Sequence, residues 1–93
     1  MKLRVVWGRR AATDVDAIVE FIAQDSKPAA KRVALYIRRS ARLLQSSPWL
    51  GRATQSDETR ELILSRYPYV LVYEIGAGEV RILAVFHQSQ NRP

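Results

Sequence analysis

The sequence contains no cysteine and only one histidine, His87. Without cysteine the protein has no disulfide framework, no thiolate nucleophile and no cysteine-based zinc site. The carboxylates offer no substitute, because Asp14 and Asp16 stand two residues apart on an expected helix and point to different sides. A glycine-rich phosphate loop is also missing, and a hydrolase triad would depend on His87 alone. The pattern therefore predicts neither a cofactor nor a metal site.

Long hydrophobic runs are absent as well. The N-terminal run from Met1 to Trp7 is too short for a signal peptide and far too short for a membrane span, and polar residues follow it. A small domain without disulfides suits a reducing compartment. We therefore expect a cytoplasmic protein in which residues 1–93 form one domain.

Lysine is scarce, since only Lys2, Lys27 and Lys31 stand among the 15 basic residues. Arginine therefore supplies most of the formal net charge of +6. Its planar fork of donors suits phosphates and carboxylates. The excess of arginine indicates an acidic partner, and composition leaves nucleic acid, an acidic protein and an anionic membrane open. A surface that is merely soluble and cationic is the alternative interpretation.

The first half of the chain predicts one strand and two helices. Residues 2–7 are rich in β-forming side chains, and Gly8 ends that run. Residues 9–24 show helical periodicity, with apolar residues at the spacing of one helix face. Ser26 is placed as the N-cap of a second helix, with Pro28 in its first turn. The two apolar stripes predict an antiparallel helical hairpin, and that of the second helix comprises Ala30, Val33, Ala34, Ile37, Ala41 and Leu44.

The second half of the chain predicts a loop and a three-stranded antiparallel meander. Residues 46–59 form the loop, and strands are expected over 60–65, 67–75 and 79–86, with a hairpin turn at 76–78. The predicted class is therefore α+β with the order β-α-α-β-β-β. We expect the helical hairpin to cover one face of an antiparallel sheet and to leave the other face available for a ligand.

A series of short motifs runs in a fixed order through the chain. It comprises the opening strand that ends in Trp7, Ala12 and Asp14 with Ile18 and Ile22, Pro28-Ala29-Ala30, Pro48-x-x-Gly51-Arg52, Arg60-Glu61-Leu62, Tyr67-x-Tyr69-Val70-x-Val72-Tyr73 and Ile82-Leu83-x-Val85-x-His87. Together these motifs resemble the RelE/ParE toxin superfamily along nearly the whole chain. The resemblance implies a RelE/ParE-like fold and an antitoxin encoded beside it. It also implies one of two activities, because RelE-like members cut messenger RNA in the ribosomal A site and ParE-like members poison DNA gyrase.

The resemblance to RelE-like members names candidate catalytic residues. Cleavage by the 2′-hydroxyl needs a base, cations for the developing phosphate charge and an acid for the leaving oxygen. The candidates are Arg60, Arg66, Arg81 and His87. The chain departs from the pattern after His87, where Gln88-Ser89-Gln90 replaces the expected basic residues, and no tyrosine follows Tyr73. A histidine at a strand end also has a structural interpretation, as a hydrogen-bonding group, and we favour it here.

These departures favour a ParE-like toxin that inhibits DNA gyrase by binding it and is not an enzyme. Its expected partners are a cognate antitoxin and gyrase, in a toxin–antitoxin hetero-oligomer, with no membrane partner. One alternative is a ribosome-dependent endoribonuclease acting on mRNA, and another is a non-toxic member that serves only in an autoregulatory antitoxin complex. Trp49 is interpreted either as an anchor for a partner or as a lid on the helices. The residues expected to contact the target or the antitoxin are Arg38, Arg39, Arg42, Trp49, Arg52, Gln88 and Arg92.

Overall fold

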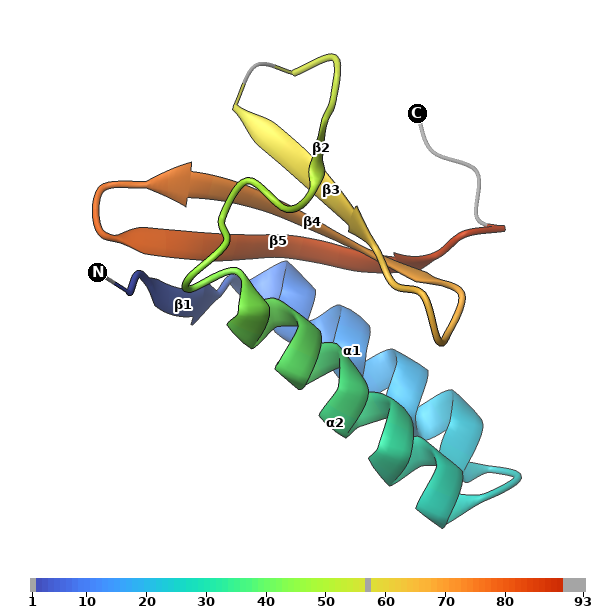
Figure 1. Cartoon of the computed structure of the whole chain (residues 1–93). Coiled ribbons are helices and arrows are strands. Elements are labelled where there is room, and N and C mark those ends of the chain that lie inside the picture. The colour runs from blue at the N-terminus through green and yellow to red at the C-terminus, as the bar shows by residue number, and fades with distance from the viewer. Residues whose placement is uncertain (1, 57, 90–93) are drawn as a thin grey trace.

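A five-stranded sheet and a pair of helices make up the computed structural model, which describes residues 2–56 and 58–89 (Figure 1). The strands lie in the order β1-β5-β4-β3-β2. Their bounds are Arg4–Trp7 for β1, Arg52–Ala53 for β2, Thr59–Ile63 for β3, Tyr69–Gly76 for β4 and Glu79–His87 for β5. The predicted α+β class and the helical hairpin packed on one sheet face are confirmed.

The helices are α1, Arg9–Ala23, and α2, Lys27–Leu43. Ser26 is the N-cap of α2, as predicted, because its Oγ accepts a hydrogen bond of 3.2 Å from the backbone N–H of Ala29. Pro28 stands in the first turn, where its missing N–H costs no helical hydrogen bond. The two helices lie side by side under the sheet, and α1 also contacts β5 (Figure 1).

The sheet differs from the prediction in one pairing. Strands β3, β4 and β5 form the expected antiparallel meander, but β1 lies parallel to β5, with Val5 opposite Val80. The sheet is therefore mixed and not wholly antiparallel. Parallel neighbours need a long connection, and the helical hairpin together with the meander supplies it. No local turn joins β1 to β5, so no local sequence signal reveals the direction of this pair.

A second difference lies in the predicted loop of residues 46–59. Arg52 and Ala53 form the short strand β2, which pairs with Glu61 and Arg60 of β3. Two residues are too few to show an alternating pattern, so periodicity could not reveal this strand. In addition, β4 begins at Tyr69 and not at residue 67, because Pro68 has no N–H to contribute to a ladder.

The core lies between the helices and one face of the sheet. A β-bulge shapes that face, since Val72 pairs with Ala84 while Tyr73 pairs with Ile82, which leaves Leu83 as an extra residue on β5. The bulge shifts the alternation of β5 by one residue, so that both Ile82 and Val85 face the helices. The buried cluster comprises Ala11, Val15, Val33, Ile37, Ala41, Leu44, Leu64, Leu71, Tyr73, Val80, Ile82 and Val85.

Candidate functional site

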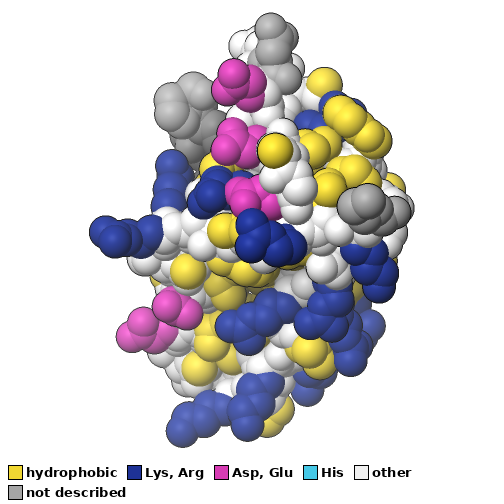
Figure 2. All heavy atoms as spheres, turned by 90° about the vertical axis from the view of Figure 1, so that its left-hand side faces the viewer, with side chains coloured by type: hydrophobic (Ala, Val, Ile, Leu, Met, Phe, Trp, Pro, Cys, Tyr) yellow, Lys and Arg dark blue, Asp and Glu magenta, His cyan; other side chains and the backbone are white. Residues whose placement is uncertain are grey.

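Charged side chains are spread unevenly over the surface. Figure 2 shows basic groups gathered over the lower, helical part of one side, while acidic groups lie mostly near the top, by the sheet. The helical part and the sheet part of this side therefore offer different electrostatic environments to a partner.

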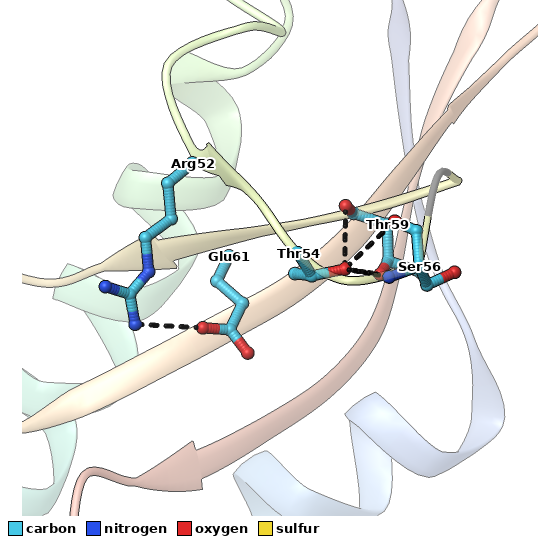
Figure 3. A network of polar contacts seen from close by, with 5 residues as sticks. All are labelled: Arg52, Thr54, Ser56, Thr59 and Glu61. Atoms are coloured by element: carbon cyan, nitrogen blue, oxygen red, sulfur yellow. Dashed lines mark hydrogen bonds and ion pairs between the residues drawn. The ribbon is translucent and has the colours of Figure 1, made fainter.

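The face of the sheet turned away from the helices carries arginine beside glutamate. Nη2 of Arg81 lies 2.9 Å from Oε2 of Glu79, whose Oε1 lies 3.4 Å from Nη2 of Arg4. Nη2 of Arg52 lies 3.2 Å from Oε1 of Glu61 (Figure 3). Ion pairs at the surface contribute little stability. They do place a carboxylate where a phosphate would have to approach Arg81 or Arg52.

The turn between β2 and β3 is closed by hydroxyl groups (Figure 3). Oγ1 of Thr54 lies 2.6 Å from Oγ1 of Thr59, and its single hydroxyl proton is within hydrogen-bonding reach of the backbone oxygens of Ser56 and Thr59, at 3.0 and 3.2 Å. The backbone N–H of Ser56 donates to the same Oγ1 at 3.1 Å. These contacts connect the ends of the turn, and the pairing that follows from them sets Arg52 beside Glu61.

The loop that follows α2 is bound to the sheet by Tyr73, which is fully buried. Its hydroxyl donates to the backbone oxygen of Pro48 at 2.7 Å and accepts from the N–H of Gly51 at 2.8 Å. A Cβ on Gly51 would stand 2.6 Å from that hydroxyl oxygen, so glycine permits the approach. Of the two residues between these contacts, Trp49 is 69% exposed and Leu50 is 53% exposed.

Arg60 supports this loop from β3. Its Nε donates to the backbone oxygen of Gly51 at 2.9 Å, and its guanidinium carbon lies 5.1 Å from the centre of the Trp49 ring. The hollow beside it, of about 440 Å³, is lined by Trp49, Glu58, Arg60, Glu74, Ile75 and Gly76. Arg60 is thus engaged in positioning the loop and shares its hollow with two carboxylates.

Arg66 lies in the turn between β3 and β4, against α2. Its backbone N–H donates to the hydroxyl of Tyr36 at 3.2 Å, and its guanidinium carbon lies 5.8 Å from the centre of the Tyr67 ring. The pocket around it, of about 190 Å³, is lined by Arg32, Leu35, Tyr36, Arg39, Arg66 and Tyr67. The sequence pattern placed Arg66 among the candidate nuclease residues and did not indicate Arg32 as a contact residue. A signal in the sequence was the helical spacing of Arg32, Leu35, Tyr36 and Arg39, which places these residues on one face of α2.

The four candidate catalytic residues lie in two groups. Arg60 is opposite Tyr73 of β4, and Arg81 is opposite Glu74. At the other end of β4, His87 is opposite Tyr69, and Arg66 lies in the turn just before Tyr69. Four residues of strand, from 69 to 73, span about 13 Å. Arg60 and Arg81 also point to opposite faces, because Arg60 is opposite Tyr73 on the helix face. The structure therefore does not bring the four residues into one site.

His87 is engaged with its neighbours. Its ring lies 5.4 Å from that of Tyr69 at an interplanar angle of 85°. Its Nδ1 accepts from the backbone N–H of Ser89 at 3.1 Å and lies 2.7 Å from the Ser89 Oγ. Such contacts are those of a histidine that holds the end of a strand.

The residues expected to contact a target or antitoxin lie in several places. Arg38 faces α1 and lines a hollow with Asp16. Arg39 lines the pocket of Arg66, and together with Arg42 it lines a second hollow near Lys2. Arg52 is paired on the open sheet face, as described above. The exposed Gln88 donates its N–H to the backbone oxygen of Pro68 at 2.8 Å, and Arg92 lies outside the described residues.

A groove that sequence analysis missed lies between α1 and the ends of β4 and β5. It has a volume of about 350 Å³ and is lined by Asp14, Ala17, Ile18, Phe21, Tyr69, Val85 and His87. Phe21 is 72% exposed at its rim. Asp14 shapes its floor, because Oδ2 accepts the N–H of Val85 at 2.9 Å. The only signal in the sequence was a phenylalanine off the apolar stripe of α1.

Two tyrosines have shifted acidities. A hydrogen bond with the Ser65 side chain, supported by the Arg66 N–H, lowers the pKa of Tyr36 below its ordinary value. Burial raises the pKa of Tyr69. Within the described part of the chain, no three His, Asp or Glu side chains gather as metal ligands would. No helix among those residues is long and apolar enough to span a membrane.

Comparison with known proteins places the chain in a family. The family model for the ParE toxin of the type II toxin–antitoxin system parDE matches residues 5–92. The chain belongs to the ParE toxin family. A candidate toxin of Sinorhizobium fredii, Y4kP, is 37% identical over 97% of this chain and 93% of its own. Toxin RelE2 of Caulobacter vibrioides is 37% identical over 94% of this chain and 97% of its own.

Solved structures agree with the family. A chain of the chromosomal ParDE toxin–antitoxin system of P. aeruginosa superposes with a TM-score of 0.82 at 25% identity, covering 92% of this chain and 96% of its own. The solution structure of a conserved protein from Helicobacter pylori gives 0.59 at 18% identity and shows the fold alone. As a member of the ParE family, the chain is a type II toxin, and the predicted superfamily is confirmed. Names of both the ParE and the RelE kind occur among the relatives, so the family leaves the target to be argued from the site.

Proposed function

We propose that this toxin inhibits DNA gyrase, and so replication, and that a cognate antitoxin neutralises it. The action would be recognition at an interface, with no bond made or broken by the toxin itself. Family membership supports the toxin–antitoxin part of the proposal. The choice of gyrase depends on the arrangement of the charged residues.

The observation that carries this choice is the separation of the four candidate catalytic groups. Arg60 and Arg81 lie at one end of β4 and on opposite faces, while Arg66 and His87 lie at the other end. A nuclease needs its base, its cations and its acid within hydrogen-bonding reach of one phosphate. The carboxylate of Glu79 beside Arg81 would further repel that phosphate.

Trp49 is the residue that we propose as an anchor for the target. It projects from a loop that Tyr73 holds in place, and Arg60 packs against its ring. Tryptophan and arginine carry a large share of the binding energy at protein interfaces. A loop that is already ordered loses little entropy on binding. Gln88 and Arg92, in the C-terminal segment, are the further proposed contacts.

The alternative of a ribosome-dependent endoribonuclease draws support from the relative named RelE2. In that case the ribosome would have to complete the site by supplying groups that this chain does not bring together. A non-toxic member that acts only in an autoregulatory complex is the third possibility.

Induced expression without the antitoxin separates these three. Filamentous growth with broken, gyrase-linked DNA is the outcome we expect. Rapid arrest of translation with cuts phased to codons in mRNA would establish the nuclease instead. Unimpaired growth, with the protein present in the soluble fraction, would favour the non-toxic member.

A pair of single variants and one double variant refine the test. Trp49→Ala should abolish inhibition of supercoiling by purified gyrase, while Leu50→Ala, at an exposed neighbour in the same loop, should retain it. Arg81→Ala combined with His87→Ala should leave toxicity intact if no RNA is cut. Loss of toxicity in that double variant, with its fold unchanged by circular dichroism, would contradict the gyrase proposal.

A further inference from the structure

The pocket between α2 and the turn from β3 to β4 is lined by basic side chains and by no carboxylate. Arg32, Arg39 and Arg66 line it. No carboxylate of residues 2–56 or 58–89 forms an ion pair with any of the three, in contrast to Arg81 and Arg52 on the sheet. Three guanidinium groups held near one another without a counter-charge favour an anionic ligand.

Ring contacts and hydrogen bonds within the chain hold the walls of this pocket in place. The rings of Tyr36 and Tyr67 meet edge to face, with 5.2 Å between centres and an interplanar angle of 77°. The Tyr36 hydroxyl lies 3.1 Å from Oγ of Ser65 and accepts the Arg66 N–H at 3.2 Å. These contacts bind the turn to α2, so a ligand meets arginines on an ordered support and does not have to order it.

Exposed leucines lie beside the arginines on the same side of α2. Leu35, which is 49% exposed, lines the pocket itself, and Leu43, at 60%, lines the adjoining hollow with Arg39 and Arg42. Arg32 and Arg39 are seven residues apart and Leu35 and Leu43 are eight apart, which corresponds to about 10 to 12 Å along the helix. The α2 strip, as we call Arg32, Leu35, Arg39 and Leu43, therefore alternates cationic and apolar side chains.

We infer that the α2 strip and the Arg66 pocket bind an amphipathic helix of a partner protein, with acidic residues about one heptad apart and leucine-like residues between them. Such a helix would pair its carboxylates with Arg32 and Arg39 and cover Leu35 and Leu43. The exposed leucines favour a protein over nucleic acid, because a phosphate backbone gains nothing from burying them. The inference rests on the proposed function in one respect, namely that the antitoxin is the expected source of the helix.

A designed peptide tests this binding without any assay of toxicity. The probe is a helical peptide of about three heptads with Glu and Leu at the matching positions, and its counterpart has Gln in place of each Glu. Calorimetry with the 93-residue chain should show binding of the Glu peptide, and the Gln peptide should bind more weakly by about tenfold or more, as expected when charge-assisted contacts are lost.

Other basic residues of α2 supply the matched control. The double variant Arg32→Glu with Arg39→Glu should bind the Glu peptide with an affinity lower by about tenfold or more. Lys27→Glu with Lys31→Glu changes the net charge equally on the same helix but outside the pocket, and should weaken binding of the Glu peptide by about twofold at most. Leu35→Ala should weaken the binding of the Glu peptide and of the Gln peptide by the same factor. Circular dichroism establishes that each variant is folded.

Three outcomes would overturn the inference. Equal losses in both double variants would show diffuse attraction and no site. Equal binding of the Glu and Gln peptides would show that the carboxylates are not recognised. Binding of a short RNA that is lost only in the Arg32/Arg39 variant, with no binding of the peptide, would make the pocket a phosphate site. None of these depends on gyrase, so the proposed function can fail while the peptide still binds.

Discussion

At the scale of single residues, Tyr73 shows how one buried hydroxyl positions an exposed side chain. It holds the backbone on both sides of Trp49 through Pro48 and Gly51. The proposed anchor thus depends on a residue that is itself fully buried.

Tyr73→Phe tests that dependence. The change leaves the Gly51 N–H and the Pro48 oxygen without their partner, and we expect a loss of about 1 to 3 kcal/mol in the free energy of unfolding. Urea denaturation measures it. Tyr67→Phe is the control, because the Tyr67 hydroxyl has no hydrogen bond to a described residue, and it should change stability by less than about 0.5 kcal/mol. An equal effect of both changes would contradict the role of the hydroxyl.

The two shifted tyrosines should ionise in a defined order. The hydrogen bond from Ser65 lowers the pKa of Tyr36, and burial raises the pKa of Tyr69, so Tyr36 should ionise first as the pH rises. The stability due to Tyr36 is present above the unfolded pKa of about 10 and is lost as the pH falls through the folded value. That due to Tyr69 is present below about pH 10 and is lost as the pH rises through its higher folded pKa. Tyrosinate absorbance in Tyr36→Phe and Tyr69→Phe assigns the phases, and the reverse order would refute the assignment.

At the scale of elements, the start of α2 depends on Ser26. Ser26→Ala removes the acceptor for the Ala29 N–H, and we expect a loss of about 0.5 to 2 kcal/mol. Thermal or urea unfolding measures this change. Ser47→Ala, at an exposed serine beyond the same helix, should stay within about 0.5 kcal/mol of the wild type. If Ser26→Asp destabilised as much as Ser26→Ala, capping would not be the cause.

Strand β5 shows a different kind of control, exerted by the bulge at Leu83. The extra residue lets a strand contribute Ile82 and Val85 to the same core face, which a regular alternation forbids. The bulge lies between Arg81 and the last residues of β5, which ends at His87. The bulge thus helps to decide which side chains of β5 reach the open face.

At the scale of the whole molecule, a formal net charge of +6 creates self-repulsion, and the arginines of the α2 strip contribute to it. Raising the ionic strength from about 0.01 to 0.15 M shortens the screening length from about 30 to 8 Å. We expect the Tm to rise by about 2 to 8 °C, the shift that about 0.5 to 1 kcal/mol produces in a domain of this size. Calorimetry measures it, and the Arg32→Glu, Arg39→Glu variant should respond less. A fall in Tm would show that the ion pairs of the open face outweigh the repulsion.

Short-range patterns in the sequence indicate both helices and the four longer strands of this protein. The apolar spacing of α1 and α2, the cap at Ser26 and the glycines of the last hairpin, where Gly78 has a φ of 72°, all act over a few residues. Such short-range effects depend on neighbours in the chain, and they can therefore be read from it. The motifs that run through the chain also predicted its superfamily.

The way in which these elements and charges come together depends on contacts between distant parts of the chain. The direction of β1, the strand β2 and the bulge at Leu83 depend on pairing between distant segments, and the order of side chains along the chain does not encode that pairing visibly. The fold places the arginines in two different environments. Arg81 and Arg52 receive carboxylates from the sheet, while Arg32, Arg39 and Arg66 meet around two tyrosines without one. Electrostatic function depends on distance in space, so the same residue type serves structure on one face and offers binding on the other.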